Sequence, residues 1–156
     1  LKSAGKPTSV TPLLQKLARN LLFKNFTQGE LTDLTSYMEA YTFDKDVTLF
    51  TEGQPSSYMC IIIDGQVDVF KTGHDSQQPI KLAEIRPGMT LGESALMDNQ
   101  DYSATTVTQK PTTLLAIQRI KYEQLVYEHP KIGLKFNRVI GRILGKRLRE
   151  TTNRLV

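Results

Sequence analysis

One short stretch of the sequence combines residue types that can hold an anion and a sugar. Residues 91–108 read LGESALMDNQDYSATTVT, in which we expect a strand, a helical turn at 94–97, a polar loop and a second strand. A helical turn that follows a glycine leaves its first backbone N–H groups without partners inside the helix, and the helix dipole is positive at that end. The carboxylate of Glu93 can accept a hydrogen bond from a sugar hydroxyl, and the hydroxyl of Ser103 can donate one to a phosphate oxygen.

This stretch resembles the phosphate-binding cassette of the cyclic nucleotide-binding domains, as in the catabolite activator protein family and the regulatory subunits of cyclic-AMP-dependent kinase. The residues that match the family pattern are Gly92, Glu93, Ala95, Leu96, Ser103, Ala104 and Thr105. Where the family has an arginine that pairs with the cyclic phosphate, this chain has Tyr102. Arginine binds phosphate through a fixed, charged fork, whereas tyrosine offers one neutral hydroxyl. Since hydrogen bonds to charged groups are worth about 1.5–3 kcal/mol each, losing two predicts an affinity lower by roughly two orders of magnitude or more.

The resemblance implies a role for each cassette residue. Glu93 would hold a ribose hydroxyl, while the backbone N–H groups of Ser94 and Ala95 and the hydroxyl of Ser103 would hold the phosphate. Tyr102 would contribute a hydroxyl or an aromatic surface. Cyclic AMP or cyclic GMP is the expected ligand, and we expect no other cofactor. The predicted ligand-binding set is Gly92, Glu93, Ser94, Ala95, Tyr102, Ser103 and Ala104.

The hydrophobic pattern changes at Tyr41 from a helical period to short strands. Segments rich in β-branched and aromatic residues there alternate with turn signals such as Asp64-Gly65. The expected strands are 41–43, 48–50, 58–63, 66–71, 80–85, 90–91, 103–108 and 113–117. Eight short strands at this spacing predict a mainly β fold with flanking helices, built on an eight-stranded jelly-roll (double-stranded β-helix) barrel. The resemblance extends over about residues 22–155, because the glycines between these strands also match the family's turns.

Helical patterns flank the predicted barrel on both sides. Ahead of it, Thr11-Pro12 and a capping box from Thr27 to Glu30 predict short helices. After it, His129-Pro130 separates a short amphipathic helix from a long C-terminal one. We therefore expect a linker or expression remnant at 1–10, helices at 11–40, the barrel at 41–118 and C-terminal helices at 119–156.

The long C-terminal helix has a broad apolar stripe and most of the positive charge. A stripe wide enough for both the barrel and a partner favours a parallel homodimer, with contacts expected from Ile140, Leu144, Leu148 and Thr151. From Lys131 onward there are eight Lys or Arg and one acid (+7), against twelve and fifteen (−3) in the rest of the chain. We interpret this charge as a solvated helix face. Binding of DNA or RNA through this helix alone is a weaker alternative.

Several classes of chemistry are absent from the sequence. The two histidines are His74, in a polar hairpin loop, and His129, beyond the barrel, so we expect no histidine-based metal site. No nucleophile–base arrangement and no triphosphate-binding loop stands out, and we expect no enzyme activity. Cys60 is the single cysteine, which suits a reducing cytoplasm, and no apolar run reaches the roughly 18–20 residues of a membrane span.

Two classes of function remain open. The leading hypothesis is a cytoplasmic regulatory domain of the cyclic nucleotide-binding type, part of a bacterial-type signalling or transcription-regulatory protein, with atypical or weakened nucleotide binding. Ligand binding would reposition the C-terminal helix. In a variant of this hypothesis, a cyclic dinucleotide or an uncharged effector stacks on Tyr102.

The second class is a degenerate domain that binds no nucleotide and acts as a dimerising interaction scaffold. The replacement of arginine by Tyr102 favours it, as do Asp98 and Asp101, whose charges repel a phosphate. In either class we expect no direct DNA binding by these residues, because nothing after Thr151 supplies a helix-turn-helix.

Overall fold

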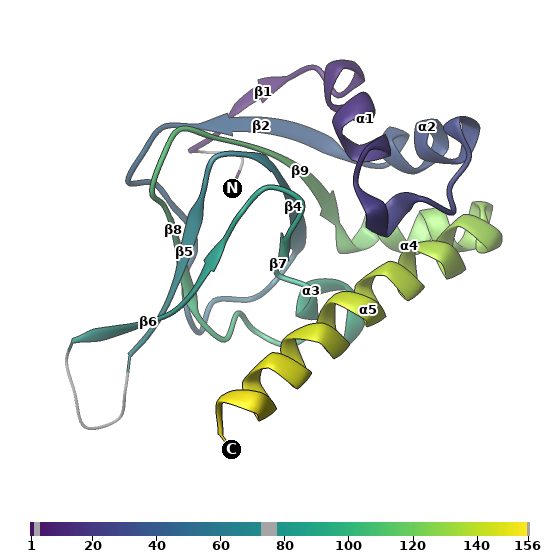
Figure 1. Ribbon diagram of the computed structural model, residues 1–156. Helices are drawn as coiled ribbons and strands as arrows, with labels where there is room; N and C mark the ends of the chain where they lie inside the picture. Colours follow the sequence, from purple (N-terminus) through teal and green to yellow (C-terminus); the bar gives the residue numbers. More distant parts are fainter. Residues whose placement is uncertain (2–3, 73–77, 156) are drawn as a thin grey trace.

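The computed structural model describes residues 1, 4–72 and 78–155. Its strands form two antiparallel sheets, with the strand orders β1-β2-β9-β4-β7 and β3-β8-β5-β6 (Figure 1). The strands are β1 (Lys6–Thr8), β2 (Glu39–Phe43), β3 (Thr48–Phe50), β4 (Tyr58–Asp64), β5 (Val67–Thr72), β6 (Pro79–Ile85), β7 (Thr90–Leu91), β8 (Thr105–Thr108) and β9 (Thr112–Gln118).

Strand β4 is buried on both faces and separates two apolar cores. Its side chains alternate, as in any strand, so that Cys60 and Ile62 enter the core between the two sheets. Ile61 and Ile63 enter a second core between the five-stranded sheet and the helices. The apolar run around Cys60 therefore fills two layers at once, and burial raises the pKa of the Cys60 thiol.

The helices cover the outer face of the five-stranded sheet (Figure 1). They are α1 (Thr11–Ala18), the 3₁₀ turn η1 (Leu21–Phe23), α2 (Gln28–Ser36), α4 (Arg119–Glu128) and α5 (Pro130–Arg154), while α3 (Ser94–Met97) is a single turn inside the cassette. The predicted capping box at the start of α2 is confirmed. The Thr27 hydroxyl accepts from the Glu30 N–H at 3.1 Å, and the Glu30 carboxylate accepts from the Thr27 N–H at 2.9 Å.

The mainly β architecture with flanking helices is confirmed, and strands occur in all eight predicted segments. Two details differ. The strands form two separate sheets and no closed barrel within the described residues. Residues 6–8, predicted as part of a linker, form β1 and pair with β2, with Pro7 opposite Tyr41. All three β1 residues are exposed, so the segment has no apolar pattern from which a strand could be predicted.

Two further predictions concern His74 and a membrane span. His74, expected in a polar hairpin loop, lies outside the described residues. Within the described residues, no helix is both long enough and apolar enough to cross a membrane.

Candidate functional site

The cassette begins where β7 ends, at a glycine that the packing requires. Gly92 has a φ of +79°, and a Cβ added to it would lie 2.6 Å from the carbonyl oxygen of Tyr58. Only glycine combines that conformation with so close an approach to β4. The chain then turns into α3, and this turn shapes one wall of a cavity of about 440 Å³. We call it the cassette pocket. It is lined by Phe50, Val69, Leu82, Ala83, Ile85, Thr90, Leu91, Gly92, Glu93, Ser94, Met97, Asp98, Tyr102, Ser103, Ala104, Thr106, Leu144 and Arg147.

Six of the seven predicted ligand-binding residues line this pocket, and Ala95 does not. The Ala95 side chain is fully buried, and its N–H donates to the carbonyl oxygen of Gly92 at 3.1 Å. This bond closes the first turn of α3, so the Ala95 N–H is engaged within the chain. The Ser94 N–H and the Ser103 hydroxyl have no hydrogen-bond partner in the described part of the chain.

Glu93 is a buried carboxylate held by two donors. Its Oε1 accepts from the Thr90 hydroxyl at 2.5 Å and from Nη1 of Arg147 at 2.7 Å. The other nitrogen of the Arg147 fork, Nη2, donates to the Thr90 carbonyl oxygen. The ion pair with Arg147 compensates the burial of the Glu93 carboxylate, since an unpaired charge is costly to transfer out of water. The second carboxylate oxygen, Oε2, has no donor among the described residues and is free to accept one.

Arg147 was missed by sequence reasoning. It lies in α5, 54 residues after Glu93, and its side chain is 31% exposed. The sequence shows it as one of eight basic residues in a helix, and nothing in the local pattern distinguishes it from the others. Only the packing of α5 across α3 decides which of these cations reaches the cassette (Figure 1).

Tyr102 forms hydrogen bonds with the protein backbone through its hydroxyl. Its hydroxyl accepts from the N–H groups of Ser57 and Tyr58 at 3.2 and 3.1 Å, and it lies 3.2 Å from the Tyr58 carbonyl oxygen, to which it donates. Its ring stacks on Phe50 with centroids 4.2 Å apart and planes at 17°. Burial is the largest influence on this phenol and raises its pKa, so the side chain is neutral. The hydroxyl therefore anchors the cassette to β4, and the residue also lines the pocket.

The charges around the pocket are mixed. Asp98 lines it, whereas Asp101 is exposed and does not. On the other side, Nζ of Lys71 donates to the Ser103 carbonyl oxygen at 3.0 Å and lies 3.5 Å from Glu52. Arg147 is thus the one cation among the described lining residues.

The residues predicted to form a dimer surface on α5 fall into different environments. Ile140 is 1% exposed and lies in the core between the helices and the sheet, so it has to be removed from the predicted set. Leu144 is 40% exposed and also lines the cassette pocket. Leu148 is 68% exposed and Thr151 is exposed, so these two lie on the outer side of the helix.

Comparisons with known proteins find related sequences over most of this chain. The family model of the cyclic nucleotide-binding domain matches residues 41–129. A CRP-like cAMP-activated global transcriptional regulator of Mycobacterium tuberculosis is 28% identical over 141 residues, which are 89% of this chain and 60% of that protein. A putative potassium channel protein of Rhodopseudomonas palustris is 26% identical over 132 residues, which are 85% of this chain and 31% of that protein.

A solved structure extends the match to nearly the whole chain. The crystal structure of a cyclic nucleotide-binding domain from Methylobacillus flagellatus superimposes with a TM-score of 0.87 at 28% identity, covering 97% of this chain and 88% of that one. By contrast, the chain spans less than two thirds of the length of the two curated relatives named above.

Proposed function

This chain belongs to the cyclic nucleotide-binding domain family, and we propose that it is a regulatory domain that binds a cyclic nucleotide in the cassette pocket. The observation that supports this most is that Glu93, Ser103 and Arg147 line one cavity. A carboxylate suits the ribose hydroxyl of such a ligand, and a hydroxyl and a guanidinium suit its phosphate.

Glu93 is the proposed ribose residue. Its Oε1 is fully engaged by Thr90 and Arg147, which fixes the orientation of the carboxylate before any ligand arrives. Oε2 is the atom that would accept the hydroxyl, since it has no donor in the described part of the chain. A carboxylate positioned in advance loses less entropy on binding than a mobile one.

The proposed phosphate residues are Ser94, Ser103 and Arg147. The Ser94 N–H lies at the start of α3, where the helix dipole favours an anion. Arg147 uses two of the five N–H donors of its guanidinium within the chain, so that others are left for a phosphate oxygen. We propose that this cation from α5 replaces the cassette arginine whose position Tyr102 occupies.

This arrangement links ligand binding to the position of α5. A ligand that contacts both the cassette and Arg147 binds best to the α5 position in which both contacts can form. Binding therefore shifts the population of α5 positions toward that one. We further propose that α5 passes the change on through a homodimer, in which Leu148 and Thr151 face the partner. The larger protein that the domain regulates would then respond to the altered helix.

The experiment is a calorimetric titration of the purified domain with cyclic AMP, cyclic GMP and cyclic di-GMP. We expect saturable binding of one of them, and an affinity at least about tenfold lower in Glu93→Gln, because a hydrogen bond to a charged group is lost. Asp101→Asn is the matched control, since it removes a carboxylate from the same cassette outside the pocket lining. No binding at millimolar ligand by a folded domain would refute the proposal.

A second candidate function is a scaffold that binds no nucleotide. It is favoured by the fact that Arg147 and Thr90 already satisfy Glu93 within the chain, and that the Tyr102 hydroxyl is occupied by backbone. In that case the cassette pocket stays empty and α5 alone carries the function. A stable dimer in sedimentation, together with no binding of the three nucleotides, would select this candidate.

A further inference from the structure

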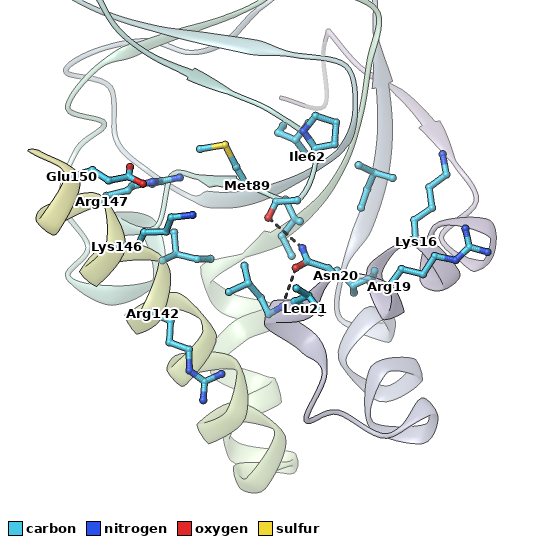
Figure 2. A pocket seen from close by; sticks show the side chains of 17 residues that line it. Lys16, Arg19, Asn20, Leu21, Ile62, Met89, Arg142, Lys146, Arg147 and Glu150 are labelled. Atoms are coloured by element: carbon cyan, nitrogen blue, oxygen red, sulfur yellow. Dashed lines mark hydrogen bonds between the residues drawn. The ribbon is translucent and has the colours of Figure 1, made fainter.

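A second cavity lies beside α5, between that helix, the α1–η1 segment and the turn before β7, and it shares Arg147 with the cassette pocket. It has a volume of about 640 Å³, within the range of ligand sites in proteins. We call it the α1–α5 cavity. Figure 2 shows α5 on one side of it, with Lys146 and Arg147, and α1 and η1 on the other, with Arg19 and Leu21.

The floor of the α1–α5 cavity is apolar and rigidly built. Leu17 and Ile61 are 1% exposed, and Ile63 and Ile143 are 8% exposed. Each belongs to the core between the helices and the five-stranded sheet. At the mouth, Leu21 is 80% exposed and Met89 is 37% exposed, so that apolar surface reaches solvent. A floor of this kind favours a ligand with a hydrocarbon body.

One polar side chain fixes the shape of the cavity. The Asn20 Nδ2 donates to the Gly88 carbonyl oxygen at 3.2 Å, and its Oδ1 accepts from the Leu22 N–H at 3.0 Å. The bond to Gly88 ties η1 to the turn before β7, and the bond from Leu22 caps η1 itself; Figure 2 draws both as dashed lines at Asn20. Because both amide atoms are engaged, Asn20 holds the wall in place and leaves little of the floor polar.

The rim carries five cations, of which three have no ion pair within the part of the chain that the structure describes. Lys16 is paired with Asp64 at 2.6 Å, and Arg147 with Glu93. By contrast, Arg19, Arg142 and Lys146 have no ion-pair partner in the described part of the chain, and Glu150 is the one acid in the lining. Lys146 extends from α5 toward the cavity, and the guanidinium groups of Arg19 and Arg142 lie at its outer edges (Figure 2).

We propose that the α1–α5 cavity binds a small anionic amphiphile, a molecule with a hydrocarbon body and a single carboxylate head. The hydrocarbon body lies on the apolar floor, and the carboxylate accepts from Lys146 at the rim, with Arg142 adding positive potential. A free nucleotide fits poorly, because the floor offers no hydrogen-bonding groups for a base or a sugar. The proposal does not depend on nucleotide binding in the cassette pocket.

The test uses decanoate below its micelle concentration, with decanol as the uncharged probe of the same length. We expect saturable calorimetric binding of decanoate that is about tenfold tighter than that of decanol, because the charged head gains hydrogen bonds to cations. In methyl NMR spectra, decanoate should shift Ile61, Ile63 and Ile143, which line this cavity and not the cassette pocket.

Variants on the exposed face of α5 separate a built site from general charge attraction. We expect the double variant Lys146→Gln/Arg142→Gln to bind decanoate about tenfold more weakly, at an unchanged unfolding midpoint. Arg138→Gln/Arg149→Gln is the matched control, since it removes two positive charges from the same helix outside the cavity lining. It should alter affinity by less than about twofold.

Three results would overturn the proposal. The first is equal affinity for decanoate and decanol, and the second is an equal loss of affinity in the double variant and the control. The third is sedimentation of the domain with phosphatidylglycerol vesicles in the absence of decanoate binding, which would assign the cationic rim to a membrane surface instead.

Discussion

Nη1 of Arg147 lies 2.7 Å from Oε1 of Glu93, and this contact joins the C-terminal helix to the cassette across 54 residues of sequence. The pair is only partly exposed, with side-chain exposures of 31% and 11%. The contact links two groups with different suitable partners. The Glu93 carboxylate suits a ribose hydroxyl, and the Arg147 guanidinium suits a phosphate. A change at the cassette and a change in the position of α5 therefore affect each other.

The first prediction concerns the anchoring role of Tyr102. Tyr102→Phe keeps the ring that stacks on Phe50 but leaves the buried N–H groups of Ser57 and Tyr58 without an acceptor. We expect the free energy of unfolding to fall by about 1–3 kcal/mol, measured by urea denaturation. Nucleotide affinity should stay the same, since the hydroxyl does not face a ligand. Tyr127→Phe, at a residue 89% exposed, is the control and should have no effect. An unchanged stability of Tyr102→Phe would contradict the anchoring role.

The second prediction concerns the missing cassette arginine. Tyr102→Arg places a charged fork at the family's phosphate position, and we expect cyclic nucleotide affinity to rise at least about tenfold in calorimetry. The variant should also be less stable, because a guanidinium cannot accept from the Ser57 and Tyr58 N–H groups. Tyr102→Gln separates the two effects, since it loses the phenol without gaining charge. Undetectable binding by a folded Tyr102→Arg domain would show that the pocket is closed to nucleotides.

The third prediction concerns pH. The ammonium of Lys135, 2.7 Å from Glu30, lowers the pKa of that carboxyl from 4.5 to about 2, with help from the Thr27 N–H. Because the folded-state pKa is lowered, the stabilisation is present above pH 4.5 and is lost as the pH falls toward about 2. The pair joins α2 to α5, so its loss loosens the contact between these helices.

Glu30→Gln tests this directly, because glutamine retains the capping box. We expect the variant to be less stable than the parent at about pH 6, and the difference to disappear near about pH 2, as measured by urea unfolding midpoints. Glu123→Gln, at an exposed carboxylate without an ion pair in the described residues, is the control for loss of a surface carboxylate and should leave the unfolding midpoint near that of the parent. A difference for Glu30→Gln that does not vary with pH would contradict the pairing.

The fourth prediction concerns the dimer. Leu134 and Leu148 are exposed on α5, and Leu155 is exposed directly after it; the three are separated by multiples of seven residues, the spacing of a coiled-coil seam. We expect the parent to sediment as a dimer at micromolar concentration and Leu148→Glu to sediment as a monomer. Leu21→Glu adds the same charge at a leucine that is 80% exposed and lies away from this seam, and it should remain dimeric. A monomeric parent would remove α5 as the dimer interface.

The fold was predictable where local pattern decides it. The eight predicted strand segments have alternating or continuous apolar residues bounded by turn signals, and all contain strands. Strand β1 has no such pattern, because it consists of three exposed residues that pair with β2.

The site was predictable only in part, because periodicity does not specify distant contacts. The cassette motif identified six lining residues, but the Ala95 N–H forms a hydrogen bond to Gly92 within the turn of α3. The apolar stripe on α5 is present in the structure, but its period does not specify which of its residues face the chain's own core. Ile140 is one residue that does. Arg147 becomes a site residue through tertiary packing alone.

The most direct test of the central claim is a cyclic AMP and cyclic GMP titration of the parent domain and of Arg147→Gln, side by side. The account predicts saturable binding by the parent and an affinity lower by about tenfold or more in the variant, because a charged partner of the phosphate is removed. Arg149→Gln should bind like the parent. Equal affinity in the parent and Arg147→Gln would contradict the proposal that α5 supplies the charge the cassette lacks, and no binding by the parent at millimolar nucleotide would contradict the sensing function itself.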